Sequence, residues 1–168
     1  MKKSLSLLIV LALCTLCAAT SFSQATATQT VNLAVNAVQK IGITGGAVTL
    51  TITTGTAGTD ALTAVTDAST SYSVTHNGAS PLKITANLDA ALASGYMLQM
   101  NLAPSAGKGT SAGTIDISNA TPASAVTVVT AIPKGADANR AITYTFSANA
   151  SAGTLAATAK TVTLTLTP

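Results

Sequence analysis

Three segments of the sequence alternate apolar residues with threonine or serine without interruption. They are residues 48–53 (VTLTIT), 142–147 (ITYTFS) and 162–167 (VTLTLT). Successive side chains of a β-strand point to opposite faces of its sheet, so this pattern buries one face and exposes the other. One buried and one solvated face is typical of antiparallel sheets. The pattern therefore predicts a fold built on antiparallel β-sheets.

Shorter alternating stretches raise the expected number of strands to about nine. Residues 77–81 (NGASP) predict a turn between a strand that ends near His76 and one that begins near Leu82. Glutamate is absent, and threonine, which favours strands, accounts for 30 of the 168 residues. We therefore expect an all-β fold, an immunoglobulin-like antiparallel β-sandwich of about nine strands. The additional strands are expected at residues 31–35, 72–75, 82–85, 98–102, 115–117 and 126–132.

One segment departs from the β pattern. In residues 88–95 (LDAALASG), Leu88 and Leu92 are four residues apart, alanine fills most other positions, and a glycine closes the stretch. This spacing is compatible with a single helical turn that ends at Gly95. In a β-sandwich the segment would form a crossover between the two sheets.

The first residues have the order of a secretory signal peptide. Lys2 and Lys3 precede an apolar run from residue 5 to about residue 19, and small residues follow. The small residues fit cleavage between Ser23 and Gln24, with a competing site at residues 17–19. We therefore expect a signal peptide at residues 1–23 and a single β-sandwich domain at residues 24–168.

Removal of residues 1–23 changes the charge and the cysteine content. The remaining chain has six basic and five acidic residues, for a net charge of +1, and neither of the two cysteines. Its basic residues are scattered, which argues against a nucleic-acid partner, and no remaining stretch is apolar for long enough to span a membrane. The expected location is extracellular or at the cell surface, with the periplasm as the alternative, and the fold is expected to lack disulfides.

The sequence offers little for catalysis or cofactor binding. His76 is the only histidine, and no nucleophile motif accompanies it. We expect an exposed histidine at a strand end, no enzymatic activity and no cofactor. The five aspartates are expected to be solvated, mostly in loops, and none matches a calcium-loop pattern, although a surface Ca²⁺ held by separate loops stays an alternative.

A glycan ligand is also possible, although the sequence has few aromatic residues to contact one. Tryptophan is absent, and Tyr144 and Phe146 are expected to face the core. Tyr72 and Tyr96 are likewise in phase with core residues of their strands. The two N-x-S/T patterns, at Asn119 and Asn149, are short enough to occur by chance in a chain rich in threonine and serine.

The threonine rows have three interpretations. Threonine is an ordinary choice for a solvated strand face, which is the simplest interpretation. Regular threonine arrays also occur in ice-binding proteins, but those of the solenoid kind have a fixed repeat that this chain lacks. A third interpretation is that uncharged faces and edges allow subunits to associate without desolvating charge. Natural sheets block such association with lysine and proline, and residues 48–53 and 161–167 contain neither.

The segment that follows the expected cleavage site is suited to strand exchange. Residues 25–38 are uncharged, and apolar residues recur in them at Val31, Leu33, Val35 and Val38. Such a segment can add as a strand to the sheet of a neighbouring subunit. The alternative is that it forms the first strand of its own domain.

In composition, strand number and terminal alternating strands, the mature chain resembles the Thr/Ala/Gly-rich β-sandwich subunits of bacterial surface fibres and secreted matrix proteins. It departs from chaperone-usher pilins because it lacks their cysteine pair and has Thr167, not an aromatic residue, next to the C-terminus. The resemblance implies an exported, non-catalytic structural subunit that self-associates, or associates with other surface proteins, in a fimbria- or matrix-like assembly. The alternative is a monomeric secreted binding module or adhesin for a glycan or matrix ligand.

Overall fold

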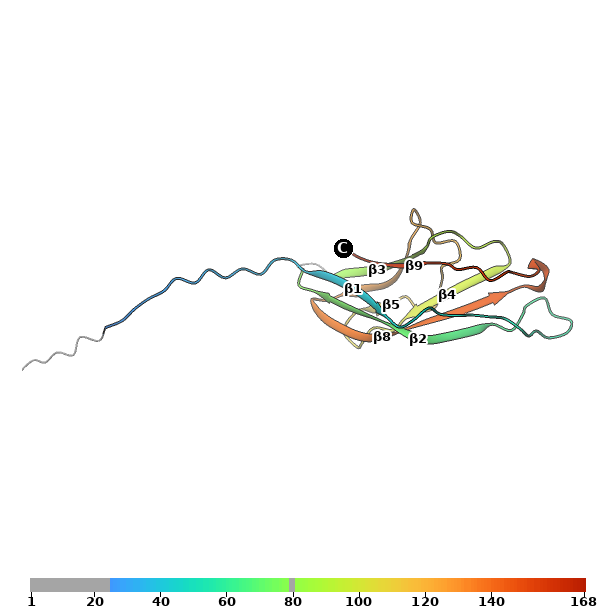
Figure 1. Ribbon diagram of the computed structural model, residues 1–168, viewed down its shortest axis with the longest axis horizontal. Coiled ribbons are helices and arrows are strands. Elements are labelled where there is room, and N and C mark those ends of the chain that lie inside the picture. The colour runs from blue at the N-terminus through green and yellow to red at the C-terminus, as the bar shows by residue number, and fades with distance from the viewer. Residues whose placement is uncertain (1–24, 79–80) are drawn as a thin grey trace, which may run out of the picture. The chain divides into compact units, whose positions relative to one another are not determined.

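In the computed structural model (Figure 1), the regular structure of the described residues consists of nine strands, all paired antiparallel, and one 3-10 helical turn, η2 (Ala150–Ala152). The structure describes residues 25–78 and 81–168, and the chain divides after residue 35 into two units. We call residues 36–168 the body. The expected signal peptide and its cleavage site between Ser23 and Gln24 lie outside the described residues. No helix of the described part is long and apolar enough to cross a membrane.

The body contains two sheets. The first has the strand order β1-β2-β8-β4-β6 and the second has the order β5-β7-β3-β9. The strands are β1 (Gln39–Thr44), β2 (Val65–His76), β3 (Leu82–Leu88), β4 (Tyr96–Leu102), β5 (Thr110–Ser111), β6 (Ile115–Asp116), β7 (Val126–Ile132), β8 (Gly135–Ala148) and β9 (Val162–Thr167).

The two sheets share one hydrophobic core. Tyr72 and Ile142 reach it from the five-stranded sheet, and Ile84 and Val128 reach it from the four-stranded sheet, all at 2% exposure or less. The core fills because the alternating strands turn their apolar rows inward. The number of strands and their antiparallel pairing in two sheets confirm the expected all-β class.

Seven of the expected strands are present, but the set of nine differs. Residues 31–35 and 48–53 are not strands, whereas β1 and β5 were not expected. Residues 48–53 do alternate between half-buried and exposed, with Val48 and Leu50 packed against the core. Their backbone nevertheless joins no ladder. In this segment the alternating sequence pattern therefore matches the burial of the side chains, although the backbone does not pair with another strand.

The segment 88–95 contains no helical turn. Leu88 is the last residue of β3, and the chain then crosses to β4 in the other sheet. The backbone N–H groups of Leu88 and Leu92 donate to the carbonyl oxygens of Ala120 and Ser118. Because these two N–H groups bind carbonyl oxygens of a neighbouring segment, they are not available for the i→i−4 hydrogen bonds of a helical turn. The expectation of a crossover between sheets is confirmed, and the expectation of a helical turn is wrong.

The connection between β2 and β3 has the expected position. β2 ends at His76 and β3 begins at Leu82, on different sheets. Asn77 directly follows β2 and binds the residues that precede β1. The connection between the two sheets therefore begins close to the point where the chain enters the body.

Candidate assembly surface

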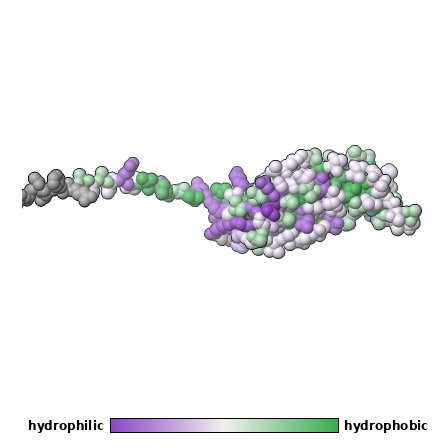
Figure 2. Space-filling view, turned by 90° about the horizontal axis from the view of Figure 1, so that it is seen from below, coloured by the Kyte–Doolittle hydropathy of each residue, from purple (hydrophilic) through white to green (hydrophobic). Residues whose placement is uncertain are grey.

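The apolar side chains of residues 31–38 are solvent-exposed. Val31, Leu33 and Val35 have exposed fractions of 66%, 89% and 88%, and Val38 is 41% exposed. Figure 2 shows apolar residues along this segment. No residue from 25 to 38 belongs to a strand, so the expectation of a first strand at 31–35 within its own domain is wrong.

Asn77 fixes the chain where it enters the body. Its Oδ1 accepts the backbone N–H of Val38 at 2.7 Å, and its Nδ2 donates to the carbonyl oxygen of Asn36 at 2.9 Å. The Asn77 backbone N–H also donates to the carbonyl oxygen of Val38 at 3.2 Å. β1 then pairs with β2 from Gln39 onward. Residues 36–38 are thus held by side-chain and backbone hydrogen bonds.

The four edge strands of the two sheets differ in length and charge. β5 and β6 have two residues each, whereas β1 and β9 have six each. β1 and β9 lie against each other, so one side of the body carries both long edges. β1 contains Lys40, and β9 contains no charged residue. β9 therefore lacks the features by which natural sheets discourage association at an edge.

The inward row of β9 is only partly covered. Val162, Leu164 and Leu166 are half-buried and pack against the core, while Thr163 and Thr165 are exposed. β9 pairs with β3 over its whole length, from Val162 opposite Leu88 to Thr167 opposite Lys83. Among the described residues, β3 is its only ladder partner.

Hydrogen bonds fix the start of β9. Asp89 donates its backbone N–H to the carbonyl oxygen of Thr161 at 3.0 Å, and its carboxylate accepts the Thr161 N–H at 3.2 Å. The ammonium group of Lys160 donates to the carbonyl oxygen of Ala91. Lys160, the charged residue that precedes β9 in sequence, is therefore bound to the crossover segment.

Four of the five aspartates bind a serine in the same way. Each carboxylate accepts both the backbone N–H and the hydroxyl of its serine. Two of these pairs are two residues apart in sequence, and two join distant segments. The pairs are Asp67–Ser69, Asp116–Ser118, Asp137–Ser105 and Asp60–Ser151.

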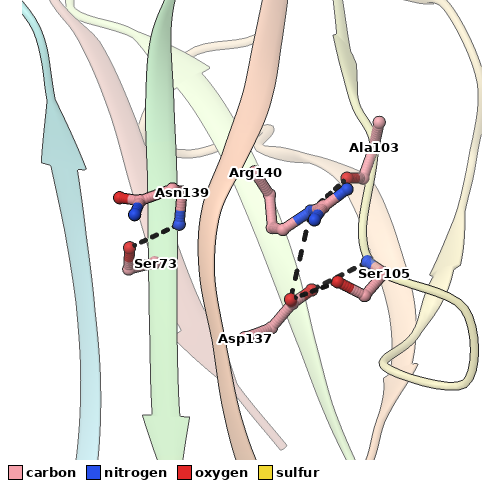
Figure 3. Close-up of polar contacts among 6 residues, drawn as sticks. All are labelled: Ser73, Ala103, Ser105, Asp137, Asn139 and Arg140. Atoms are coloured by element: carbon pink, nitrogen blue, oxygen red, sulfur yellow. Dashed lines mark hydrogen bonds and ion pairs between the residues drawn. The ribbon is translucent and has the colours of Figure 1, made fainter.

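The Asp137 side chain is only 9% exposed (Figure 3). Ser105 contacts both of its oxygens, and the Arg140 Nε lies 4.0 Å from one of them while donating to the carbonyl oxygen of Ala103. Nearby, Asn139 has a left-handed φ of 54°, and its N–H donates to Ser73. The expectation of a solvated loop aspartate is wrong for Asp137, which lies in β8 and holds the segment after β4.

The segment after β4 borders an open hollow of ≈ 540 Å³. The residues that line it carry hydroxyl, amide and small apolar groups, with no aromatic and no charged side chain among them. The lining consists of Asn101, Ala103, Pro104, Ser105, Ala106, Gly109, Thr110, Ser111 and Gly113. This surface can form hydrogen bonds but presents no flat platform for a sugar ring.

His76 is buried, contrary to the expectation of an exposed strand end. Its side chain is 2% exposed, and its Nε2 lies 3.2 Å from the carbonyl oxygen of Ile132. β2 lies between β1 and β8, so Gln39 and Gly135 flank His76 in the ladder. The sequence did contain a signal for this burial, because His76 is in phase with the inward residues Tyr72 and Val74. Among the described residues, no cluster of three or more His, Cys, Asp or Glu side chains could hold a metal ion.

The aromatic side chains of residues 25–78 and 81–168 lie in the body's interior or at one end of β4. Tyr72 and Tyr144 are buried, as expected. Tyr96 stacks on Phe146 with ring centroids 6.4 Å apart, and its hydroxyl donates to the carbonyl oxygen of Ala152. These rings are therefore committed to packing within the chain.

The chain matches no protein-family model and no curated protein sequence.

Proposed function

We propose that this protein is an exported, non-catalytic structural subunit with an immunoglobulin-like β-sandwich fold, and that it self-associates by β-strand addition through residues 25–38. The observation that carries the proposal is the exposure of Val31, Leu33 and Val35 on an uncharged segment that forms no strand. Burial of one such side chain contributes about 1.5–3 kcal/mol. A partner that buries all three while pairing with their backbone would stabilise the segment as a strand.

The remaining features of the proposed subunit agree with this role. The order of charged, apolar and small residues at 1–23 is the basis for proposing export to the cell surface or the extracellular space. Residues 25–38 and β9 carry no charge, so the free-energy cost of removing both from water is small. The composition resembles that of β-sandwich subunits of bacterial surface fibres and secreted matrices.

A second candidate function is a monomeric binding module for a glycan or matrix ligand. The open hollow after β4 favours it, because Asn101, Ser105 and Ser111 place hydroxyl and amide groups along its wall. Sharp, saturable hits on a glycan array would favour this function. Such hits should then disappear in a Ser111→Trp variant, in which a bulky side chain fills the hollow.

Truncation tests the assembly proposal. The chain that begins at Gln24 is compared with chains that begin at Asn36 and at Gln39, by size-exclusion chromatography and electron microscopy. The chain that begins at Asn36 keeps the backbone groups that Asn77 binds. Comparison with the chain that begins at Gln39 therefore distinguishes the effect of losing residues 24–35 from the effect of losing the Asn77 hydrogen bonds. We expect oligomers or fibres only from the longest chain. If that chain is monomeric at every concentration and forms no fibres, the proposal is wrong.

A length-matched variant is the control for the truncations. Replacing Val31, Leu33 and Val35 together by serine keeps the segment but removes its apolar row. The variant should be monomeric and should unfold at the same urea concentration as the Asn36 variant. Assembly of the serine variant would show that the apolar row is not the cause of association.

A further inference from the structure

We propose that the acceptor for residues 31–35 is the free edge of β9 in a second copy of the chain, with the two strands antiparallel and Leu33 opposite Leu164. This inference rests on the proposed function, since it specifies where the exchanged strand binds. It commits to one occupant, the exposed segment described above.

The choice of β9 follows from a comparison of the four edges. β5 and β6 are too short to pair with a donor of five residues. β1 is long enough, but Lys40 lies on it, and its burial pattern shows one half-buried residue among five exposed ones. β9 is six residues long, uncharged, and has a half-buried apolar row. β1 contacts β9 but forms no ladder with it. Among the edges, only β9 combines a six-residue backbone that has one ladder partner with a half-buried apolar row.

The donor and β9 match in length and in chemistry. Residues 31–35 alternate apolar and small polar or alanine side chains (VNLAV), and β9 alternates apolar residues and threonine (VTLTLT). Three apolar side chains of the donor can thus cover the three half-buried ones of β9. Asn32 and Ala34 would then lie beside exposed threonines on the solvated face. No charge is buried on either strand.

The direction of the donor follows from the two ends of the body together with a head-to-tail stacking of the copies, which is part of the proposal. Asn77, which holds residues 36–38, lies at the same end as Thr167, because Thr167 pairs with Lys83 near the start of β3. Val162 lies at the opposite end, where it pairs with Leu88. In a head-to-tail array, a donor leaving the Asn77 end of one copy enters the next copy at its Val162 end.

This arrangement fixes the pairing. The donor's residue 35 lies near the entry, at Val162, and its residue 31 lies deeper, at Leu166. Residue numbers therefore increase toward the entry in the donor and away from it in β9, so the strands are antiparallel. Directly opposed residues share a face of the sheet. The register pairs Val35 with Val162, Leu33 with Leu164 and Val31 with Leu166, so that all three pairs face the core.

The contact joins two different surfaces of identical subunits. Such a heterologous contact does not close on itself when successive copies are related by translation along one axis, and it then produces a filament. The proposal therefore predicts open fibres and no closed dimer.

Cysteine cross-linking tests the register. The chain that begins at Gln24 has no cysteine of its own, so introduced cysteines report only the intended contact. Opposed residues in an antiparallel pair have Cα atoms about 4.5–5.5 Å apart, which a disulfide can bridge. The test variant combines Leu33→Cys with Leu164→Cys. The control combines Leu33→Cys with Thr165→Cys, whose side chain faces the other side of the sheet.

After mild oxidation of assembled protein, we expect a ladder of disulfide-linked multimers from the Leu33/Leu164 variant and not from the control. A second pair, Val35→Cys with Val162→Cys, gives the same readout if the first variant folds poorly. Assembly with neither ladder would overturn β9 as the acceptor while leaving self-association in place. A disulfide that forms only within single chains would also overturn it. Absence of assembly in unmodified protein would overturn both the acceptor and the proposed function.

Discussion

The Asp137 carboxylate accepts the backbone N–H of Ser105 at 2.9 Å and the Ser105 hydroxyl at 2.6 Å. Thirty-two residues separate this pair in sequence. The two hydrogen bonds therefore tie the segment after β4 to the beginning of β8. The Asp60–Ser151 pair joins two other distant segments in the same way. These contacts organise connecting segments in a domain that we expect to lack disulfides.

Replacement of Asp137 by alanine should destabilise the body. The change leaves the Ser105 N–H and hydroxyl without their acceptor in a partly buried site, which costs about 1.5–3 kcal/mol. Urea unfolding followed by circular dichroism measures the loss. Asp67→Ala is the matched control, because Asp67 makes the same two bonds to Ser69 at an exposed, sequence-local site. Equal losses in the two variants would contradict a specific role for the long-range pair.

Alkaline pH should destabilise the protein through its buried tyrosines. Burial raises the pKa of Tyr72 from 10.0 to about 12, with a further contribution from the Asp137 charge, and burial also raises the pKa of Tyr144. Between these values the unfolded chain releases protons that the folded chain keeps. The free energy of unfolding therefore falls as the pH rises from 10.0 to about 12.

Tyr72→Phe should reduce this pH dependence. Its hydroxyl is buried and has no hydrogen-bond partner among the described residues, so the substitution should cost little stability at neutral pH. The measurement is the urea midpoint at about pH 8 and about pH 11, on either side of the ordinary tyrosine pKa. An unchanged slope between these two pH values in the variant would contradict the assignment to Tyr72.

A lysine in the donor segment should weaken assembly according to the face it occupies. Leu33→Lys places a charge in the row that is proposed to contact the core, whereas Asn32→Lys places it on the solvated face. We expect the concentration needed for assembly to rise at least about tenfold for Leu33→Lys, which corresponds to about 1.4 kcal/mol, and to change little for Asn32→Lys. Sedimentation of assembled protein provides the measurement. Leu33 is 89% exposed, so unfolding of the body would not explain the effect.

Gly95 should tolerate alanine less well than Gly58 does. Both have a positive φ, of 88° and 84°, so alanine is strained at either position by about 1–2 kcal/mol. A Cβ on Gly95 would also lie 2.5 Å from the Cβ of Ala152, whereas a Cβ on Gly58 has nothing within 4 Å. Thermal unfolding should therefore show a lower Tm for Gly95→Ala. Equal Tm values would mean that the Ala152 segment moves aside freely.

Period-two alternation predicted the strands best where a segment pairs on at least one side and packs its apolar row on the core. β7 has the expected bounds at Val126 and Ile132, and the expected alternation at 142–147 and 162–167 lies within β8 and β9. The same pattern at 48–53 accompanies side-chain burial without a ladder. Side-chain burial and backbone pairing are separate physical conditions. The alternation of apolar and polar residues predicts side-chain burial, but it does not predict which backbone segments pair.

Of the candidate assembly surface, only the exposed segment at residues 31–35 was predictable from the sequence. The exposed apolar row at 31–35 was visible in the sequence, although the strand expected there is absent. The role of Asp137 was not visible, because its contact with Ser105 depends on the pairing of β4 with β8. The half-buried state of β9 likewise depends on its position at the edge of a sheet. Such features arise from tertiary neighbours that no local pattern specifies.

The Asn77 anchor has a mechanical consequence. In a fibre assembled as proposed, tension on the donor segment would pass through residues 36–38, which Asn77 holds, into β1 and its six residue pairs with β2. Hydrogen bonds loaded lengthwise must shear together, whereas bonds at a peeled end break one after another. Extraction of the chain at its entry point would therefore require the loss of the Asn77 hydrogen bonds and of the β1–β2 ladder.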